Sequence, residues 1–219
     1  MTGSADTDNT NEEKIRSKKR VLANKKATYP VEVWIDKREA KLINVLMKKQ
    51  QEHEENGQMN KVMKNGNESA IKTKNLDLAD IIFYDPVEQK EKLRIERKTL
   101  SDLNSSIKDG RYRQQKLRLQ STTPVVDFLY IIEGELMIGY NDTASFETMG
   151  RNVWEPKIVY GSLWNLVLRD NIAIFKTQNV VETANLVESL YWKAHKQGFK
   201  SFIKDDFEKT TEGKMSGER

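Results

Sequence analysis

Short strand-like runs that alternate with helix-like stretches constrain this chain more than any other feature of its sequence. The segment VEVWID at residues 31–36 alternates apolar and polar residues and is rich in β-branched and aromatic side chains, as in a buried strand. Apolar residues at helical spacing follow it, and the same exchange recurs along most of the chain. Strands alternating with helices predict an α/β domain in which helices cover a mostly parallel or mixed central sheet.

Further elements are predicted from the same patterns. We expect strands in residues 71–84, 92–98, 125–134 and 171–177. Helices are expected in residues 40–47, 100–108, 111–118, 160–168 and 180–197. Asn179 and Glu182 stand at capping-box spacing at the start of the last helix.

Composition excludes several classes of protein. The 219 residues include no cysteine, which rules out disulfide scaffolds, zinc ribbons and thiol nucleophiles. The two histidines, His53 and His195, are too few for a histidine-ligated metal site. No apolar run approaches the roughly 20 residues needed to cross a bilayer, and the first residues lack the apolar core of a secretory signal. We therefore expect a soluble intracellular protein without membrane contact.

Charge is distributed unevenly along the chain. Lysine and arginine total 37 against 33 acidic residues, a net charge of +4. Residues 1–28 are basic with almost nothing to bury, so we expect a disordered arm. We interpret that arm either as a solvated tail or as a functional segment, namely a nuclear import signal or a phosphate-contacting arm. Residues 29–200 form the expected domain, and within it we expect a long surface loop or a frayed hairpin at 50–74. Residues 201–219 are expected to be a polar tail.

The segment from Asp80 to Asp102 carries the candidate chemistry. Because strand side chains alternate, Glu96 and Lys98 point to one face of their strand. Asp102 lies in the first turn of the next helix, where the helix dipole favours its charge. Neighbouring strands are about 4.8 Å apart, so Asp80 and Glu96 can converge on one hard cation with Lys98 beside them.

That grouping suits phosphodiester hydrolysis. Magnesium prefers carboxylate oxygens, keeps several waters and bridges to substrate phosphate, and it lowers the pKa of a bound water. A lysine at position 98 would stabilise the developing negative charge. Asp36 and Glu39, at the end of the first strand, would join the site if that strand neighbours Asp80. Taken alone, however, an Asp-Glu-Lys set also arises by chance in a chain this highly charged.

The wider sequence resembles a known nuclease family. The segments Ala79-Asp80, Glu96-Arg97-Lys98 and Asp102 follow the Gly-Asp, Glu-Arg-Lys, x-x-x-Asp pattern of the XPF/Mus structure-specific endonucleases, a branch of the restriction-endonuclease-like fold. The segments VEVWIDKRE, SSIKDGRYRQQ and FLYIIEG resemble the opening strand, the helix-turn-helix segment and a core strand of that family. The resemblance covers residues 30–197 and implies a mixed central β-sheet flanked by helices.

The resemblance also implies roles for individual residues. Metal coordination would fall to Asp80, Glu96 and the backbone carbonyl of Arg97, with Asp36 and Glu39 assisting directly or through water. Lys98 would be the catalytic lysine, and Asp102 would orient the site. The Arg97 side chain would alternatively pair with an acid such as Asp102. The basic helix would either face DNA or simply present a solvated surface. Its expected DNA-facing residues are Arg111, Arg113, Gln115, Lys116 and Arg118.

The predicted activity is that of a Mg²⁺-dependent endodeoxyribonuclease, with Mn²⁺ as a substitute, that cleaves flaps, forks or branched recombination and repair intermediates. The alternatives are a non-catalytic scaffold subunit of a nuclease heterodimer, or a restriction-like nuclease without branch preference. The family dimerises through its nuclease domain, so a homodimer or heterodimer is expected. In a eukaryote, or a virus of eukaryotes, its place would be the nucleus.

The sequence departs from the family pattern in three respects. Ala79 replaces the family glycine, and the stretch 50–74 is longer than usual. The Gly-rich hairpins of a helix-hairpin-helix module, which usually follows the nuclease domain in this family, are not expected in this sequence. The last departure leaves the substrate geometry and the independent DNA affinity open.

Overall fold

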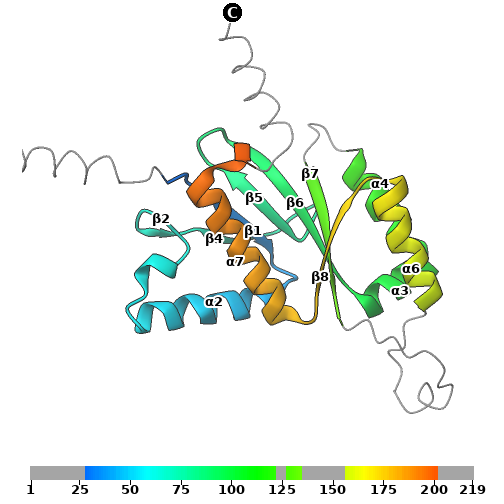
Figure 1. Ribbon diagram of the computed structural model, residues 1–219, viewed down its shortest axis with the longest axis horizontal. Coiled ribbons are helices and arrows are strands. Elements are labelled where there is room, and N and C mark those ends of the chain that lie inside the picture. Colours follow the sequence, from blue (N-terminus) through cyan, green and yellow to red (C-terminus); the bar gives the residue numbers. More distant parts are fainter. Residues whose placement is uncertain (1–27, 122–126, 135–155, 202–219) are drawn as a thin grey trace, which may run out of the picture.

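The computed structural model describes residues 28–121, 127–134 and 156–201 (Figure 1). The expected arm at 1–28, except its last residue, and the polar tail from residue 202 onward lie outside the described residues. Within the described ranges, no helix has both the length and the apolar character that a membrane span requires.

A six-stranded mixed sheet forms the centre of the domain, with strand order β4-β1-β5-β6-β7-β8. Its strands are β1 (Glu32–Asp36), β4 (Ile71–Lys74), β5 (Ile81–Asp85), β6 (Lys90–Thr99), β7 (Asp127–Glu133) and β8 (Ala173–Thr177). Strand β5 runs antiparallel to both β1 and β6, whereas β1–β4, β6–β7 and β7–β8 are parallel pairs. The predicted α/β fold class with a mixed central sheet is confirmed.

Helices cover both faces of this sheet (Figure 1). The longer helices are α2 (Ala40–Glu55), α3 (Leu100–Lys108), α4 (Arg111–Gln120), α6 (Pro156–Trp164) and α7 (Val180–Gln197). A π-helical segment, η2 (Asn165–Arg169), continues α6, and η3 (Phe199–Ser201) follows α7. Figure 1 shows α2 and α7 grouped on one side of the sheet and α3, α4 and α6 on the other.

Each face of the sheet has its own hydrophobic core. Ile81 and Ile95 pack in the first core with residues of α2 and α7. Ile82 and Tyr130 pack in the second core with residues of α3, α4 and α6. Because side chains alternate along a strand, Glu96 next to Ile95 must point to the second face, toward α3 and α4. The packing of the sheet therefore decides which side carries the charged groups of β6.

Two expectations about the first half of the chain need correction. The single strand expected over residues 71–84 is divided into β4 and β5, and these are not neighbours because β1 lies between them. The polar residues Asn75 and Asp77 interrupt the strand, and the chain crosses from one side of β1 to the other between β4 and β5. The stretch 50–74, predicted as a long surface loop or a frayed hairpin, does contain a hairpin, formed by β2 (Lys64–Asn65) and β3 (Glu68–Ser69), but it also contains the end of α2 and the short helix η1 (Met59–Lys61).

The helices expected in residues 100–108, 111–118 and 180–197 are present, whereas the one expected in 160–168 begins at Pro156 and becomes a π-helix at Asn165. Asn179 accepts hydrogen bonds from the backbone N–H groups of Val181 and Glu182, both at 3.0 Å, as the capping-box spacing predicts. In α2 the Met47 side chain is exposed, and Leu42, Leu46 and Gln50 face the core. The Gln50 side-chain oxygen accepts from the Met63 N–H at 2.6 Å, which anchors the insertion to α2.

Candidate active site

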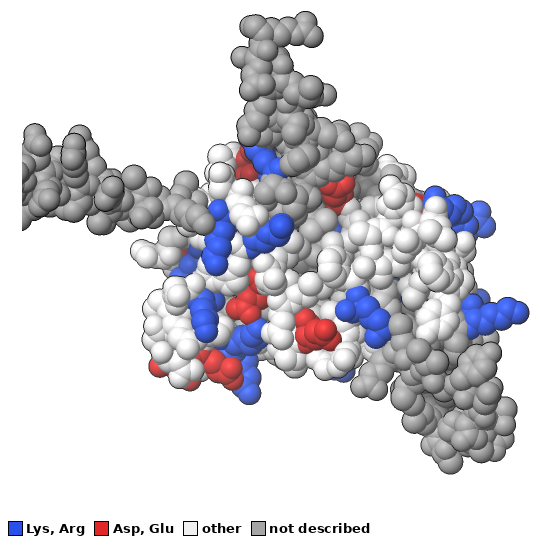
Figure 2. Space-filling view, viewed as in Figure 1, with Lys and Arg blue, Asp and Glu red and all other residues white. Residues whose placement is uncertain are grey.

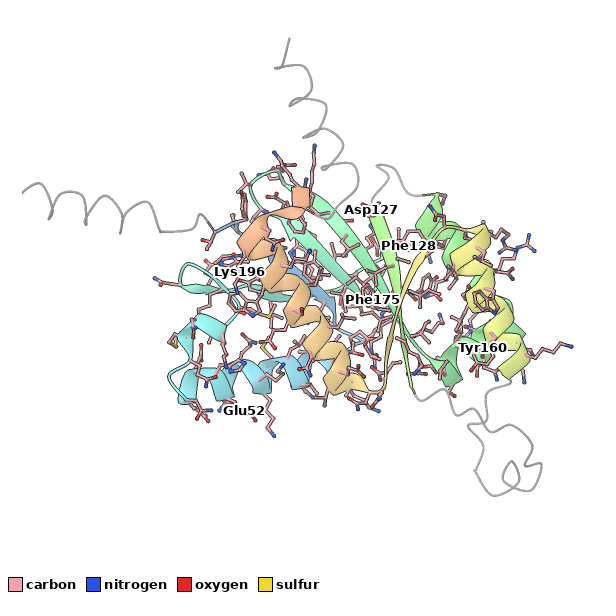
Figure 3. The ribbon with its side chains drawn as sticks, in the orientation of Figure 1. Glu52, Asp127, Phe128, Tyr160, Phe175 and Lys196 are labelled. Carbon is pink, nitrogen blue, oxygen red and sulfur yellow. The ribbon has the colours of Figure 1, made fainter. Side chains whose placement is uncertain are left out.

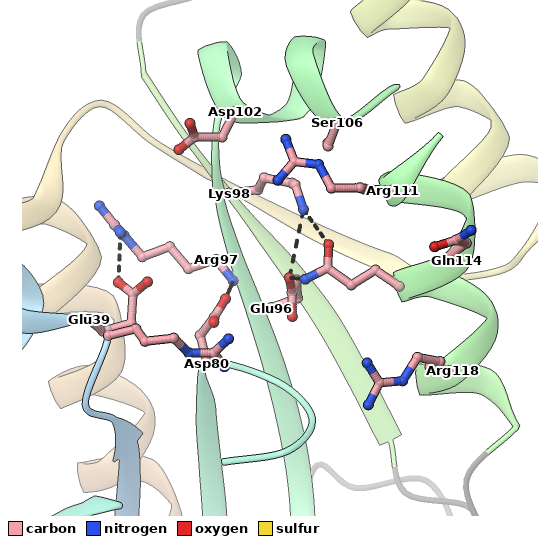
Figure 4. Close-up of a pocket in the computed structure, with 12 residues that line it drawn as sticks. Glu39, Asp80, Glu96, Arg97, Lys98, Asp102, Ser106, Arg111, Gln114 and Arg118 are labelled. Atoms are coloured by element: carbon pink, nitrogen blue, oxygen red, sulfur yellow. Dashed lines mark hydrogen bonds and ion pairs between the residues drawn. The ribbon is translucent and has the colours of Figure 1, made fainter. Parts of the chain in front are cut away.

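A pocket of about 490 Å³ lies beside the carboxyl end of β6 and brings together most of the predicted site residues (Figure 4). From the acidic and lysine set it gathers Glu39, Asp80, Glu96, Arg97, Lys98 and Asp102. From α4 it gathers Arg111, Gln115 and Arg118. Residues from four segments far apart in the sequence therefore share one pocket.

Backbone hydrogen bonds fix the position of Asp80. Its N–H donates to the carbonyl of Ile95 in β6, and its own carbonyl accepts from Asp36, both at 2.9 Å. The Asp80 carboxylate accepts from the backbone N–H of Arg97 at 2.8 Å. Burial raises the pKa of Asp80 to about 6, although the Arg97 hydrogen bond opposes that rise. Asp80 therefore lies immediately before β5 and next to β6. Its position beside the strand that bears Glu96 agrees with the prediction from strand spacing.

Glu96 and Lys98 share a face of β6 and are both buried. Burial, and then the charge of Asp80, raise the pKa of Glu96 to about 8. The Lys98 ammonium lies 3.8 Å from the nearer Glu96 oxygen, longer than a hydrogen bond. The Gln115 side chain bridges the two groups: its oxygen accepts from Lys98 and its nitrogen donates to Glu96, each at 2.6 Å. Figure 4 shows Lys98 and Glu96 side by side in the pocket.

The Arg97 side chain leaves β6 on the opposite face and pairs with two acids. Its guanidinium donates to Glu133, at the end of β7, over 2.9 and 2.5 Å. It also donates to Glu39 at 2.7 Å. The sequence-based alternative, an Arg97–acid pair, is therefore realised with Glu39 and Glu133 rather than with Asp102. Glu39 lines the pocket, but its carboxylate is bound to an arginine.

Asp36 does not take part in the pocket, which corrects its expected place in the site. One carboxylate oxygen accepts from the backbone N–H and the Nε of Arg38, at 2.8 and 2.7 Å. The other accepts from the N–H of Leu76 at 2.8 Å and from the Arg38 guanidinium at 3.2 Å. The hydrogen bond from the Arg38 side chain is the main cause that lowers the pKa of Asp36 to about 2. Asp36 closes the turn after β1 and anchors Arg38.

Asp36 and Glu39, which were expected to assist the metal ligands directly or through water, thus each have an arginine partner. Across the described residues, no group of three or more His, Cys, Asp or Glu side chains is arranged to hold a metal ion. What the pocket offers is the pair Asp80 and Glu96. Both pKa values are raised, mainly by burial, so the two carboxylates favour a bound proton or a cation over remaining charged side by side. Magnesium is often held by one or two carboxylates plus water and substrate phosphate, and the pair fits that ion.

Other predicted residues take defined places. Asp102 is exposed at the start of α3, where its carboxylate accepts from the Thr99 hydroxyl at 2.7 Å and its N–H donates to the same hydroxyl. On α4, Arg111 and Arg118 are exposed in the pocket, whereas Arg113 is exposed outside it. Lys116 is buried and donates to Asp170 at 2.6 Å. The expectation that Lys116 contacts DNA is therefore corrected.

Sequence reasoning overlooked three lining residues, Arg38, Ser106 and Gln114. Arg38 belongs to the Asp-x-Arg-Glu segment already noted in the opening strand, so that motif was the available signal. Its side chain is 73% exposed while its partner Asp36 is buried, which makes Arg38 a cation held in a fixed place at the pocket rim. Ser106 and Gln114 belong to the segment SSIKDGRYRQQ, whose resemblance to the family's helix-turn-helix segment was the available signal for them.

The comparison with protein families decides what kind of domain this is. The model of the ERCC4 domain matches residues 35–190, which include every acidic residue of the pocket and its lysine. The chain therefore belongs to the ERCC4 domain family. This confirms the resemblance to XPF-type nucleases drawn from the motif. A search of curated proteins found no match to this chain.

Solved structures are also similar to this ERCC4 domain. XPF from Aeropyrum pernix in complex with DNA shares 23% identity with a TM-score of 0.48, covering 74% of this chain and 64% of that one. A second structure of XPF from Aeropyrum pernix shares 23% identity with a TM-score of 0.49, and the match covers 76% of this chain and 66% of that one. The chain thus spans just under two thirds of the length of these structures.

Proposed function

We propose that this ERCC4 domain is a metal-dependent, structure-specific DNA endonuclease that hydrolyses phosphodiester bonds in flaps, forks or branched intermediates. One observation supports this above the others: Asp80, Glu96 and Lys98 line a single pocket. Neither carboxylate is closed off by a hydrogen-bonded basic side chain among the described residues, because Asp80 accepts from a backbone N–H and Glu96 from an amide. A purely structural cluster would pair each acid with a base.

The proposed roles follow from these positions. Asp80, Glu96 and the backbone carbonyl of Arg97 would hold Mg²⁺ or Mn²⁺, which when bound supplies charge neutralisation and lowers the pKa of a water. Lys98 presents its ammonium group to the phosphate and stabilises the negative charge that develops there. Asp102 holds the first turn of α3 against the end of β6. Arg111 and Arg118 bind neighbouring phosphates of the DNA backbone.

The test is cleavage of an end-labelled flap substrate in Mg²⁺ by wild type, Asp80→Asn and Asp77→Asn. Asp77 is exposed and lies three residues earlier, so its variant is a matched control for the same chemical change. We expect Asp80→Asn to lose activity by about 100-fold or more and Asp77→Asn to retain it. An inactive wild type, or equal rates for all three proteins, would refute the proposal. Equal rates on linear and branched duplexes would instead indicate a nuclease without branch preference.

We also propose that two copies of the chain associate through the face formed by β8 and α7. Phe175 is half exposed on the edge strand β8 (Figure 3), and it lines an apolar pocket of about 230 Å³ with Leu186 and Leu190 of α7. Figure 2 views the same side and shows acidic and basic side chains scattered around uncharged surface rather than one basic patch. An apolar edge with scattered charge suits a self-complementary interface better than DNA.

Light scattering on wild type and Phe175→Glu tests the dimer. We expect a dimeric wild type and a monomeric variant. A monomeric wild type that dimerises only with a second, different nuclease subunit would identify a heterodimer instead. For a eukaryotic or viral source we further propose the nucleus, and deleting residues 1–28 from a fluorescent fusion tests whether the arm directs it there.

A further inference from the structure

Gln115 occupies a position in the pocket that a DNA contact does not explain. It was expected to face DNA, but its amide hydrogen-bonds to both charged groups of β6, Lys98 and Glu96. The oxygen faces the Lys98 ammonium and the nitrogen faces the Glu96 carboxylate. The reverse orientation would place an N–H group against a cation and an oxygen against an anion. The charges on β6 therefore fix the amide in a single orientation.

The helix holds Gln115 in place through its buried face. Tyr112 and Lys116 of α4 are both buried, the latter through its ion pair with Asp170. Gln115 lies three residues after Tyr112 and one before Lys116, so it projects from the edge of that same buried face toward β6. The packed helix fixes the backbone of Gln115, and the two hydrogen bonds to Lys98 and Glu96 hold its amide.

The 3.8 Å between Lys98 and Glu96 exceeds the 2.7–2.9 Å that a charge-assisted hydrogen bond prefers. Both residues lie on one face of one strand, and the lysine side chain is long and flexible. A shift of about 1 Å would turn this long ion pair into one with a direct hydrogen bond. Such a pair would satisfy Glu96 with a resident cation and turn the ammonium away from the substrate.

We propose that Gln115 is a positioning residue that keeps Lys98 and Glu96 apart and thereby leaves the carboxylate for a divalent cation and the ammonium for the phosphate. The inference rests on the proposed nuclease function for its purpose, but it makes a separate claim about two side chains. It assigns Gln115 to the catalytic pair rather than to DNA affinity.

A double-mutant cycle on Mn²⁺ binding, measured by calorimetry without DNA, tests the inference. Gln115→Met keeps the length of the side chain and removes both hydrogen bonds. We expect it to weaken Mn²⁺ affinity about tenfold in the presence of Lys98, because the lysine then competes for Glu96. In the Lys98→Met background, the same change should alter the affinity by less than about twofold. Equal weakening in both backgrounds would overturn the inference.

Kinetics on the flap substrate give a second, independent readout. Gln115→Met should lower kcat while KM and the DNA dissociation constant stay near wild type. Weaker DNA binding with unchanged Mn²⁺ affinity would make Gln115 a DNA contact and overturn the inference. Gln51→Met serves as the matched control, since it removes an amide-to-carboxylate hydrogen bond to Glu55 on the exposed face of α2.

Two further outcomes separate this inference from the proposed function. If Gln115→Met does not fold, Gln115→Asn replaces it in the same cycle, because the shorter amide cannot span both partners. A wild type that binds Mn²⁺ with the expected coupling but does not cleave DNA would refute the nuclease function and uphold the role of Gln115. A wild type that binds no Mn²⁺ would refute both.

Discussion

The backbone N–H of Arg97 holds the Asp80 carboxylate at 2.8 Å. The same residue sends its guanidinium to the other face of β6, where it joins Glu39 to Glu133. Glu133 in turn accepts a hydrogen bond at 2.7 Å from Thr183 of α7, which is fully buried. One residue thus connects the candidate catalytic acid to the helix that closes the first core.

Replacing Arg97 by Met should therefore destabilise the domain strongly. Two largely buried carboxylates would lose their cation, and breaking buried ion pairs costs about 3–5 kcal/mol. Urea unfolding of the metal-free protein measures the loss. Arg113→Met, on the exposed face of α4, is the control and should change the free energy of unfolding by less than about 0.5 kcal/mol. Similar values for the two variants would contradict the role given to Arg97.

The raised pKa values of Asp80 and Glu96 predict how stability varies with pH. Their folded-state values, about 6 and 8, lie above the ordinary 3.8 and 4.5, so the folded protein binds more protons than the unfolded one between these limits. In EDTA, the free energy of unfolding should be highest at the acidic end of this window and fall as pH rises through about 8. Urea unfolding across about pH 5–9 measures that slope.

Glu96→Gln should remove most of this slope, since the amide does not titrate. Adding Mg²⁺ at the alkaline end should restore stability to the wild type and not to the variant, because a ligand that binds only the folded state stabilises it. A flat profile for wild type in EDTA would show that the two carboxylates are not strained by burial.

Ala79 directly precedes Asp80 and has a φ of 67°, a left-handed conformation that favours glycine. Replacing it by Gly relieves about 1 kcal/mol of strain but also removes a buried methyl group of similar value. Ala70→Gly removes a buried methyl where the backbone is not in that region. We therefore expect Ala79→Gly to be less destabilising than Ala70→Gly by about 1 kcal/mol in thermal or urea unfolding. Equal losses would argue against the strain.

Lys116 and Arg118 should differ although both are basic residues of α4. Lys116→Met leaves the poorly exposed Asp170 short of one cation and should lower stability by about 1–3 kcal/mol with little effect on DNA affinity. Arg118→Met should leave stability unchanged and weaken DNA binding. The slope of log affinity against log salt concentration should become shallower by about one. Fluorescence anisotropy over a salt series, beside urea unfolding, measures both. The reverse pattern would return Lys116 to the DNA surface.

The sequence by itself determined that Glu96 and Lys98 share one face of their strand, where that strand lies in the chain, and the cap at Asn179. These follow from alternation along one strand and from hydrogen bonds within one turn, which are local. Only the tertiary structure decided the partners. The Asp36 carboxylate accepts from the N–H of Leu76, 40 residues away, and Lys116 donates to Asp170, 54 residues away. Spacing sets the direction of a side chain, but its partner is the group that folding brings from elsewhere in the chain to meet it.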